Sequence, residues 1–434
     1  MSILFTNVAA LTMDPAKPAL DGAFVAVEGT KITFVGTQRP AGEFERVVDC
    51  TGKVMMPGLV NAHTHVAMSL MRGYGGGCDL HTWLNDYIFP AEDKLDSRCI
   101  AAGTALGLAE MIASGVTCIA DMYMHTGTVA RTVLESGISA NLACGAVYFG
   151  APEDFSPKTC NDCENHIRLF EEWHGAGDGQ ILVDASIHAE YTSCAPVWEW
   201  VAEFAQKHGL GMHVHVSETH SEHEKCIDKY GTTPAQLLDR YGVWNNGGIA
   251  AHCVHLSDGD AELFAKRGVT AVHNPVSNLK LMSGVAPLFF LRDCGTSLAL
   301  GTDGVASNNS HNMFEEMKVA ALTQNNSFGE DHGLLPSADI LAMATVNGAR
   351  ALRRDAGVIA AGKMADLILL DVTHPNLFPC HDIMENLVYS AAPSNVVMNM
   401  ARGKIIYENG TFLTLDLEKI RAEVKNYALP HIFG

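Results

Sequence analysis

The sequence has no long apolar run and no basic leader. None of its apolar stretches approaches the roughly 20 residues that span a bilayer, so we expect no transmembrane helix. The N-terminal stretch MSILFTNVAALTMDP has no basic residue ahead of its short apolar run, and Asp14 follows soon after it. We therefore expect no signal peptide.

Basic residues are also few. Among 434 residues there are 29 Lys and Arg against 49 Asp and Glu, and the formal charge of −20 argues against nucleic-acid and anionic-membrane partners. The 12 cysteines lack the spacing of a disulfide framework, so we expect reduced thiols and a cytoplasmic protein. Cys160 and Cys163 form a C-x-x-C with no second pair nearby, and we interpret this motif as incidental.

Both ends of the chain have the composition of β-strands. GAFVAVEGTKITFVG predicts two strands around a turn at Glu28 and Gly29, and ADLILLDV and GKIIYENGTF predict strands near the C-terminus. Asn409-Gly410 is a hairpin signal. The two ends could therefore pair into one small sheet domain.

The middle of the chain alternates apolar strands with helices that end at glycine, as in ILVDASIH followed by VWEWVAEFAQKHG. Repeated β-then-α units predict a parallel sheet. About eight such units fit from Val60 onward, which is the number a closed (β/α)₈ barrel needs. An open doubly wound sheet is the alternative, and the absence of a G-x-G-x-x-G after an early strand disfavours it.

Polar residues recur where the apolar strands stop. In a barrel the carboxyl ends of all strands meet at one face, so these side chains should gather there. Any one of them could be a structural loop residue, but six strands ending this way favour a site. The residues are His63, His65, His188, His213, His215, His252, His273 and Asp303.

Alternate residues of a strand share a face, so His63 and His65 in GLVNAHTHVAM can bind one object. Three imidazoles and a carboxylate suit a zinc-like divalent ion. We expect the ligands to be His63, His65, His215 and Asp303. His213 shares a face with His215, and the pattern alone cannot choose between them; His215 is preferred because Glu218 completes H-x-x-E.

Several motifs together resemble the amidohydrolase superfamily. They are PGLVNAHTH, HVSE, AAHCVHL, HNPVSNLKL and LGTDGVASNNS, with GKMADLILLD near the C-terminus. The chain looks most like the cytosine-deaminase-related branch, and within it like the 5′-methylthioadenosine/S-adenosylhomocysteine deaminases. This resemblance implies an α/β fold, a distorted (β/α)₈ (TIM) barrel over residues 58–356 with a small β-sandwich formed by residues 1–57 and 357–434.

The resemblance also implies one catalytic metal ion, usually zinc and sometimes iron, held by the four residues named above. By the same carry-over, Glu218 is the proton shuttle and His252 orients the attacking water, while Asp303 accepts its proton. Trp83, Glu92 and His188 match residues near the nucleoside, with Glu218 also at the base. The implied substrates are adenine nucleosides: methylthioadenosine, adenosine, 5′-deoxyadenosine and S-adenosylhomocysteine.

One departure concerns the last of these substrates. Relatives that use S-adenosylhomocysteine can carry an Arg in the third-strand segment, where this chain has Cys144. Cysteine cannot replace the paired hydrogen bonds of Arg to a carboxylate, so nucleosides without the amino-acid tail should be better substrates. Arg72 is a candidate for an alternative cation.

Other readings remain open. The chain could be a related aminohydrolase for guanine, an oxidised purine, a pterin or an s-triazine, or a scaffold that kept the barrel and lost catalysis. A cytidine-deaminase site is disfavoured because His188-Ala-Glu190 has no P-C-x-x-C partner. A two-metal site is disfavoured because ILVDASIHAEY has no bridging lysine. Homo-oligomer formation is compatible with the sequence but not determined by it.

Overall fold

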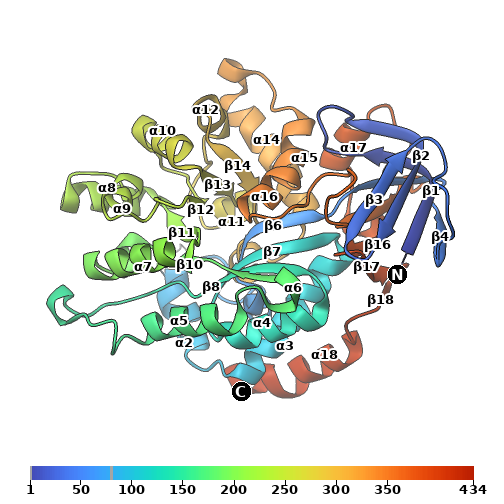
Figure 1. Cartoon of the computed structure of the whole chain (residues 1–434). Coiled ribbons are helices and arrows are strands. Elements are labelled where there is room, and N and C mark those ends of the chain that lie inside the picture. The colour runs from blue at the N-terminus through green and yellow to red at the C-terminus, as the bar shows by residue number, and fades with distance from the viewer. Residues whose placement is uncertain (1, 79–81) are drawn as a thin grey trace.

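The computed structural model describes residues 2–78 and 82–434, and its centre is a barrel of parallel strands (Figure 1). Eight strand positions surround the axis, which confirms the predicted number of units. They are β6 (Leu59–Thr64), β7 (Val116–Met122), β8 (Ser139–Ala143), β9 (Ile181–Val183) with β10 (Ala185–Ser186), β11 (Met212–Val216), β12 (Gly248–His252), β13 (Val269–His273) and β14 (Ser297–Leu300).

The barrel is distorted at the fourth position. The sequence predicts one strand over ILVDASIH, but the structure divides it at Asp184, so that β9 pairs with β8 and β10 pairs with β11. The Asp184 carboxylate accepts a hydrogen bond from Asn141 and forms an ion pair with Arg353. These contacts fix the backbone at the point where the strand is interrupted. A bridge between Thr64 and Asp303 links the first strand to the last and closes the barrel.

Helices cover the outside of the barrel, and several end at glycine as predicted. Gly137 (φ 92°) follows α4 and Gly209 (φ 66°) follows α7, in the left-handed region that glycine adopts without strain. The helices of the barrel are α3 (Ser97–Ala113), α4 (Thr126–Ser136), α5 (Asn161–Trp173), α7 (Ala195–His208), α8 (His220–Tyr230), α9 (Pro234–Arg240), α10 (Asp258–Arg267), α11 (Pro275–Lys280), α12 (Leu288–Asp293), α13 (Val305–Asn308), α14 (Met313–His332), α15 (Ser337–Met343) and α16 (Val346–Ala351).

The two ends of the chain form one sheet beside the barrel, in the order β18-β17-β16-β15-β5-β1-β2-β3 with β4 on β1 (Figure 1). It curls around its own core, and Lys31 meets Met364 where β3 approaches the C-terminal segment. Its strands are β1 (Ser2–Leu11), β2 (Ala19–Glu28), β3 (Lys31–Gly36), β4 (Arg46–Asp49), β5 (Lys53–Pro57), β15 (Leu367–Asp371), β16 (Val396–Ala401), β17 (Lys404–Glu408) and β18 (Thr411–Phe412).

The last helices leave this sheet and return to the barrel. Helix α17 (Ile383–Tyr389) precedes β16, whereas α18 (Leu417–Glu423), a π-helical turn (Val424–Ala428) and α19 (Leu429–Phe433) run along α3. Arg98 of α3 pairs with Glu423, and Tyr427 donates a hydrogen bond to Asp96. Within residues 2–78 and 82–434, no helix has the length and apolar character needed to cross a membrane.

Candidate active site

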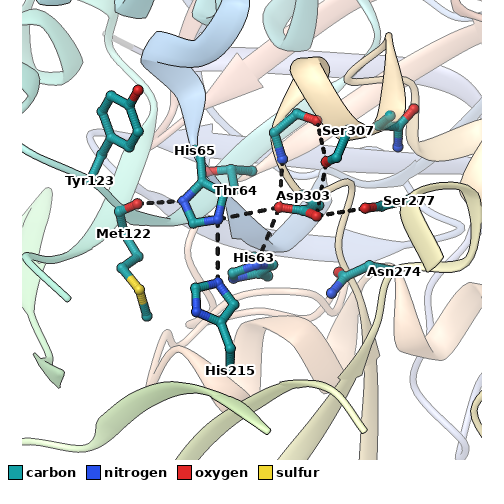
Figure 2. Close-up of polar contacts among 12 residues, drawn as sticks. His63, Thr64, His65, Met122, Tyr123, His215, Asn274, Ser277, Asp303 and Ser307 are labelled. Carbon is teal, nitrogen blue, oxygen red and sulfur yellow. Dashed lines mark hydrogen bonds and ion pairs between the residues drawn. The ribbon is translucent and has the colours of Figure 1, made fainter. Parts of the chain in front are cut away.

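Three histidines and an aspartate converge at the carboxyl end of the barrel (Figure 2). His63 lies in β6 and His65 follows directly after it, His215 lies in β11, and Asp303 follows β14. The Asp303 Oδ1 atom lies 3.5 Å from His63 Nε2 and 3.3 Å from His65 Nε2. The ligand atoms of the three histidines all lie within 4.8 Å of one another, as do those of His63, His252 and Asp303. This arrangement is a candidate metal centre.

The outer ring nitrogens of two of these histidines are anchored to the backbone. His65 Nδ1 lies 2.5 Å from the Met122 carbonyl oxygen, and His215 Nδ1 lies 2.8 Å from that of His188. A carbonyl only accepts, so each Nδ1 carries the proton and each Nε2 offers a lone pair. These two Nε2 atoms are 3.3 Å apart. Two lone pairs and a carboxylate at this distance repel one another unless a cation lies between them.

His63 and His213 have different places in the cluster. His63 Nδ1 is 2.8 Å from His213 Nε2, while the buried His63 Nε2 has no hydrogen-bond partner among the described residues. His213 therefore contacts the outer ring nitrogen of His63, Nδ1. His215 lies on the other side, among the ligand atoms near His63 Nε2. Burial holds the pKa of His63 and of His215 well below the usual histidine value, so both rings are neutral, which is the form that binds metal ions.

Asp303 is fixed by residues of two short helices. Its Oδ2 accepts hydrogen bonds from Ser277 Oγ of α11 at 2.6 Å and Ser307 Oγ of α13 at 2.9 Å, and this leaves Oδ1 toward the histidines. Burial opposes its ionisation, but the surrounding imidazoles hold its pKa well below the usual range. Gly301, two residues before Asp303, is sterically required, because a Cβ at this position would lie 2.9 Å from the Cβ of His63.

Glu218 and His252 lie on the cavity side of this cluster. Glu218 Oε2 is 3.7 Å from His252 Nε2, and Oε1 accepts a 3.4 Å hydrogen bond from Ser283 Oγ. Burial raises the pKa of Glu218 despite the opposing effect of His252. Burial favours neutral His252, but the carboxylates of Glu218 and Asp303 outweigh it and raise the pKa of this histidine. His252 Nδ1 is held by Asn278 Oδ1 at 2.8 Å.

A cavity of about 620 Å³ opens from the cluster, large enough for a nucleoside. Trp83, Glu92 and His188 all line it. Trp83 starts a π-helical turn (Trp83–Ile88), and its Nε1 donates to the Tyr74 carbonyl, so it is also a packing residue. Glu92 ends helix α2 (Phe89–Glu92), and its Oε1 accepts a 2.5 Å hydrogen bond from Tyr123. Residues 79–81 of this loop lie outside the described residues.

Cys144 and Arg72, the two residues expected to affect substrate selectivity, lie in different places. Cys144 lines the cavity, with its sulfur 3.0 Å from His166 Nδ1. Arg72 pairs with Glu110 and donates to the Asn309 carbonyl, and it does not line the cavity. It is therefore not placed to meet a substrate carboxylate.

Sequence reasoning missed the residues that support the site. The two serines on Asp303 lie within the motifs HNPVSNLKL and LGTDGVASNNS, but the pattern alone gave them no role. Thr219-x-x-Glu222 is a capping-box signal that could have identified Glu222. His273 lies buried at the end of β13, and neither of its ring nitrogens has a partner among the described residues. It does not belong to either group of converging ligand atoms.

Comparison with known proteins agrees with this geometry. The sequence profile of the amidohydrolase family matches residues 54–406, and the chain belongs to this family. It is 41% identical over 433 residues to a 5-methylthioadenosine/S-adenosylhomocysteine deaminase of Acetivibrio thermocellus, with 99% of both chains covered. It is 40% identical over 426 residues to a 5′-deoxyadenosine deaminase of Methanosarcina acetivorans, with 98% of this chain and 97% of that protein covered.

Solved structures with a similar fold include two deaminases. An adenosine deaminase from Xanthomonas campestris with bound zinc superposes with a TM-score of 0.92 and 31% identity, covering 99% of this chain and 98% of the other. A guanine deaminase from C. acetobutylicum superposes with a TM-score of 0.82 at 20% identity, covering 94% of this chain and 100% of the other, which shows the shared fold alone.

Proposed function

We propose that this protein is a metal-dependent hydrolase that deaminates an adenine nucleoside to the inosine analogue and ammonia. The observation that carries the proposal is the convergence of His63, His65, His215 and Asp303 beside Glu218 at the mouth of a nucleoside-sized cavity. Relatives about 40% identical over nearly the whole chain are named as deaminases of such nucleosides, which supports this choice.

The donor set fits one divalent ion, and zinc suits three imidazoles and a carboxylate best. Two observations support this fit: the buried Nε2 of His63 has no hydrogen-bond partner among the described residues, and the Nε2 atoms of His65 and His215 face each other. When bound, the ion supplies a Lewis acid that lowers the pKa of water enough for nucleophilic attack near neutral pH. We assign its ligands as these three histidines and Asp303.

Different residues of the chain carry out the individual proton transfers. Asp303 accepts the proton of the attacking water, which His252 orients. Glu218, whose pKa is raised by burial, delivers a proton to the ring nitrogen beside the amino-bearing carbon. That carbon becomes electrophilic, hydroxide adds to it, and a tetrahedral centre forms on the substrate. A further proton reaches the amino group, which leaves as ammonia.

We assign substrate contacts to the cavity wall. Trp83, Glu92 and His188 would hold the sugar and base, with Glu218 at the ring nitrogen; all four line the cavity. We place this chemistry in residues 58–356 and assign residues 1–57 and 357–434 to the accessory strand domain. The proposed partner is a small-molecule nucleoside. A homo-oligomer and a cytoplasmic location remain proposals from the sequence.

The test is ammonia release by purified protein loaded with zinc. The substrate panel is methylthioadenosine, 5′-deoxyadenosine, adenosine, S-adenosylhomocysteine, guanine, a pterin and an s-triazine. We expect the adenine nucleosides to have the highest kcat/KM and the chelated protein to be inactive. Preference for guanine, the pterin or the triazine would contradict the substrate class, and no turnover by metal-loaded protein would favour a silent scaffold.

A further inference from the structure

The turn that presents Glu218 is held by a carboxylate outside the cavity wall. This turn lies between β11 and α8, and its three successive peptide N–H groups point at Glu222. Ser217 N donates to Glu222 Oε1 at 2.7 Å, and Glu218 N donates to Oε2 at 2.8 Å. Thr219 N makes a longer contact with Oε2, 3.4 Å. Both carboxylate oxygens of Glu222 therefore accept hydrogen bonds from the backbone of Glu218 and its two neighbours.

The turn needs this support because its backbone is strained. Ser217 has φ 48°, a left-handed conformation that costs a non-glycine residue free energy. The Ser217 carbonyl accepts hydrogen bonds from Val254 N and His255 N, just beyond His252 and Cys253, which have φ 72° and 52°. The turns that carry Glu218 and His252 are thus linked through one strained residue.

Glu222 is itself buried and has a second acidic neighbour. Its exposed fraction is 8%, and Glu190 from the turn Glu190–Thr192 lies against it with 3% exposed. Burial and the charge of Glu222 raise the pKa of Glu190, and burial and the charge of Glu218 raise the pKa of Glu222. The backbone N–H groups of residues 217–219 oppose the rise in the pKa of Glu222, because they stabilise its charged form.

We propose that Glu222 is a positioning residue for Glu218: by accepting the N–H groups of residues 217–219, it holds the turn in which the Glu218 carboxylate faces His252 and the cavity. This inference rests on the proposed function, because Glu218 is assigned there as the proton donor. Glu222 is itself neither one of the candidate metal ligands nor one of the residues that line the cavity.

The test is a double-mutant cycle with Glu222→Gln and Glu218→Gln. Glutamine keeps the shape of Glu222 but turns an NH₂ group toward one of the backbone donors. We expect kcat to fall roughly 10- to 100-fold in Glu222→Gln, a partial loss that does not exceed the roughly 10²-fold minimum contribution of a general acid–base group, with KM changed by less than about 3-fold and metal content unchanged. In the Glu218→Gln background the second change should cost less than about 3-fold, because residues that act through one group are not additive.

Thr219→Ala is the matched control. Thr219 Oγ1 accepts the N–H of Glu222 at the start of α8, so this change weakens the same helix end but leaves the Glu222 acceptor oxygens in place. We expect a lower melting temperature with kcat within about 3-fold of wild type. Full additivity in the cycle, or an equal loss of kcat in Thr219→Ala, would show that Glu222 contributes only general stability.

Amide hydrogen exchange tests the inference apart from the chemistry. At least one of the amides of residues 217 and 218 should exchange about 10-fold faster or more in Glu222→Gln than in Thr219→Ala, because only the first change replaces one of their two acceptor oxygens by an NH₂ group. Equal protection in both variants overturns the positioning role even if the protein has another substrate. If Glu222→Gln does not fold, Glu222→Asp, which shortens the reach but keeps both oxygens, replaces it in all three measurements.

Discussion

An anionic tail on the substrate should be penalised by this cavity. Within the described residues its wall contains no Arg or Lys, whereas it contains the carboxyl groups of Glu92, Asp93, Asp162, Glu218 and Asp303. Cys144, where the family resemblance implies an Arg in some relatives, contacts His166. Asp162 accepts the N–H of Val147 at 2.8 Å, so its position in the wall is fixed. A substrate carboxylate would enter this cavity without a cationic partner.

The size of the penalty follows from the missing pair. A hydrogen bond to a charged group contributes about 1.5–3 kcal/mol. At about 1.4 kcal/mol for each tenfold, this corresponds to roughly 10- to 150-fold in kcat/KM. S-adenosylhomocysteine also carries an ammonium group that the acidic wall can attract. The carboxylate is therefore best isolated by comparison with the descarboxy analogue, in which hydrogen replaces the carboxylate and the ammonium is kept.

Steady-state deamination kinetics provide the measurement. We expect the descarboxy analogue to exceed S-adenosylhomocysteine in kcat/KM by this factor, and methylthioadenosine, adenosine and 5′-deoxyadenosine also to exceed it. An arginine substitution at Cys144 should narrow the gap. If S-adenosylhomocysteine equals its descarboxy analogue or is the best substrate, the reasoning from the cavity wall is refuted and a cationic group from elsewhere must reach the tail.

Four further predictions concern the metal content, the metal affinity, the proposed proton donor and the stability of the fold. Elemental analysis should find about one tightly bound divalent ion per chain, and two ions that are both required for activity would contradict the single site. His213→Ala should weaken metal affinity by roughly 10- to 100-fold, because it removes the partner of His63 Nδ1. Glu218→Gln should retain metal while kcat falls by roughly 10² or more; near-normal turnover would remove Glu218 from the mechanism. Burial raises the pKa of Asp366 from 3.8 to about 6, so its ionisation costs stability as pH rises through this window. A pKa difference of about 2 is worth about 3 kcal/mol. Urea unfolding at pH 4 and pH 7.5 should therefore show that the free energy of unfolding of Asp366→Asn, relative to wild type, rises by up to about this much between the two pH values. A difference between variant and wild type that does not change with pH would contradict this prediction.

The sequence by itself determined the elements that depend on local patterns. Alternating apolar strands and glycine-terminated helices predicted the barrel, and the Asn409-Gly410 signal predicted the hairpin between β17 and β18. Both patterns arise from backbone geometry that neighbouring residues impose. The strand-end histidines followed for the same reason, since parallel strands in a barrel bring their carboxyl ends to one face.

Tertiary structure decided which of His213 and His215 lies among the candidate metal ligands. His213 and His215 share one face of β11, and the pattern treats them alike. They differ because β6 places His63 between them, with its Nδ1 toward His213, while the carbonyl of His188 on a neighbouring segment turns His215 Nε2 toward His65. The break at Asp184 has a similar origin, because its partners Asn141 and Arg353 are 43 and 169 residues away along the chain.

The support of the acidic residues also depended on contacts that the local sequence pattern does not specify. The serines that fix Asp303 come from two helices 26 and 4 residues away, and the unfavourable φ of Ser217 is sustained by hydrogen bonds to the turn after β12. Local sequence encodes which residue types stand at a strand end, because periodicity and propensity act over a few residues. The direction in which each side chain points is set by hydrogen bonds that exist only once the barrel has closed.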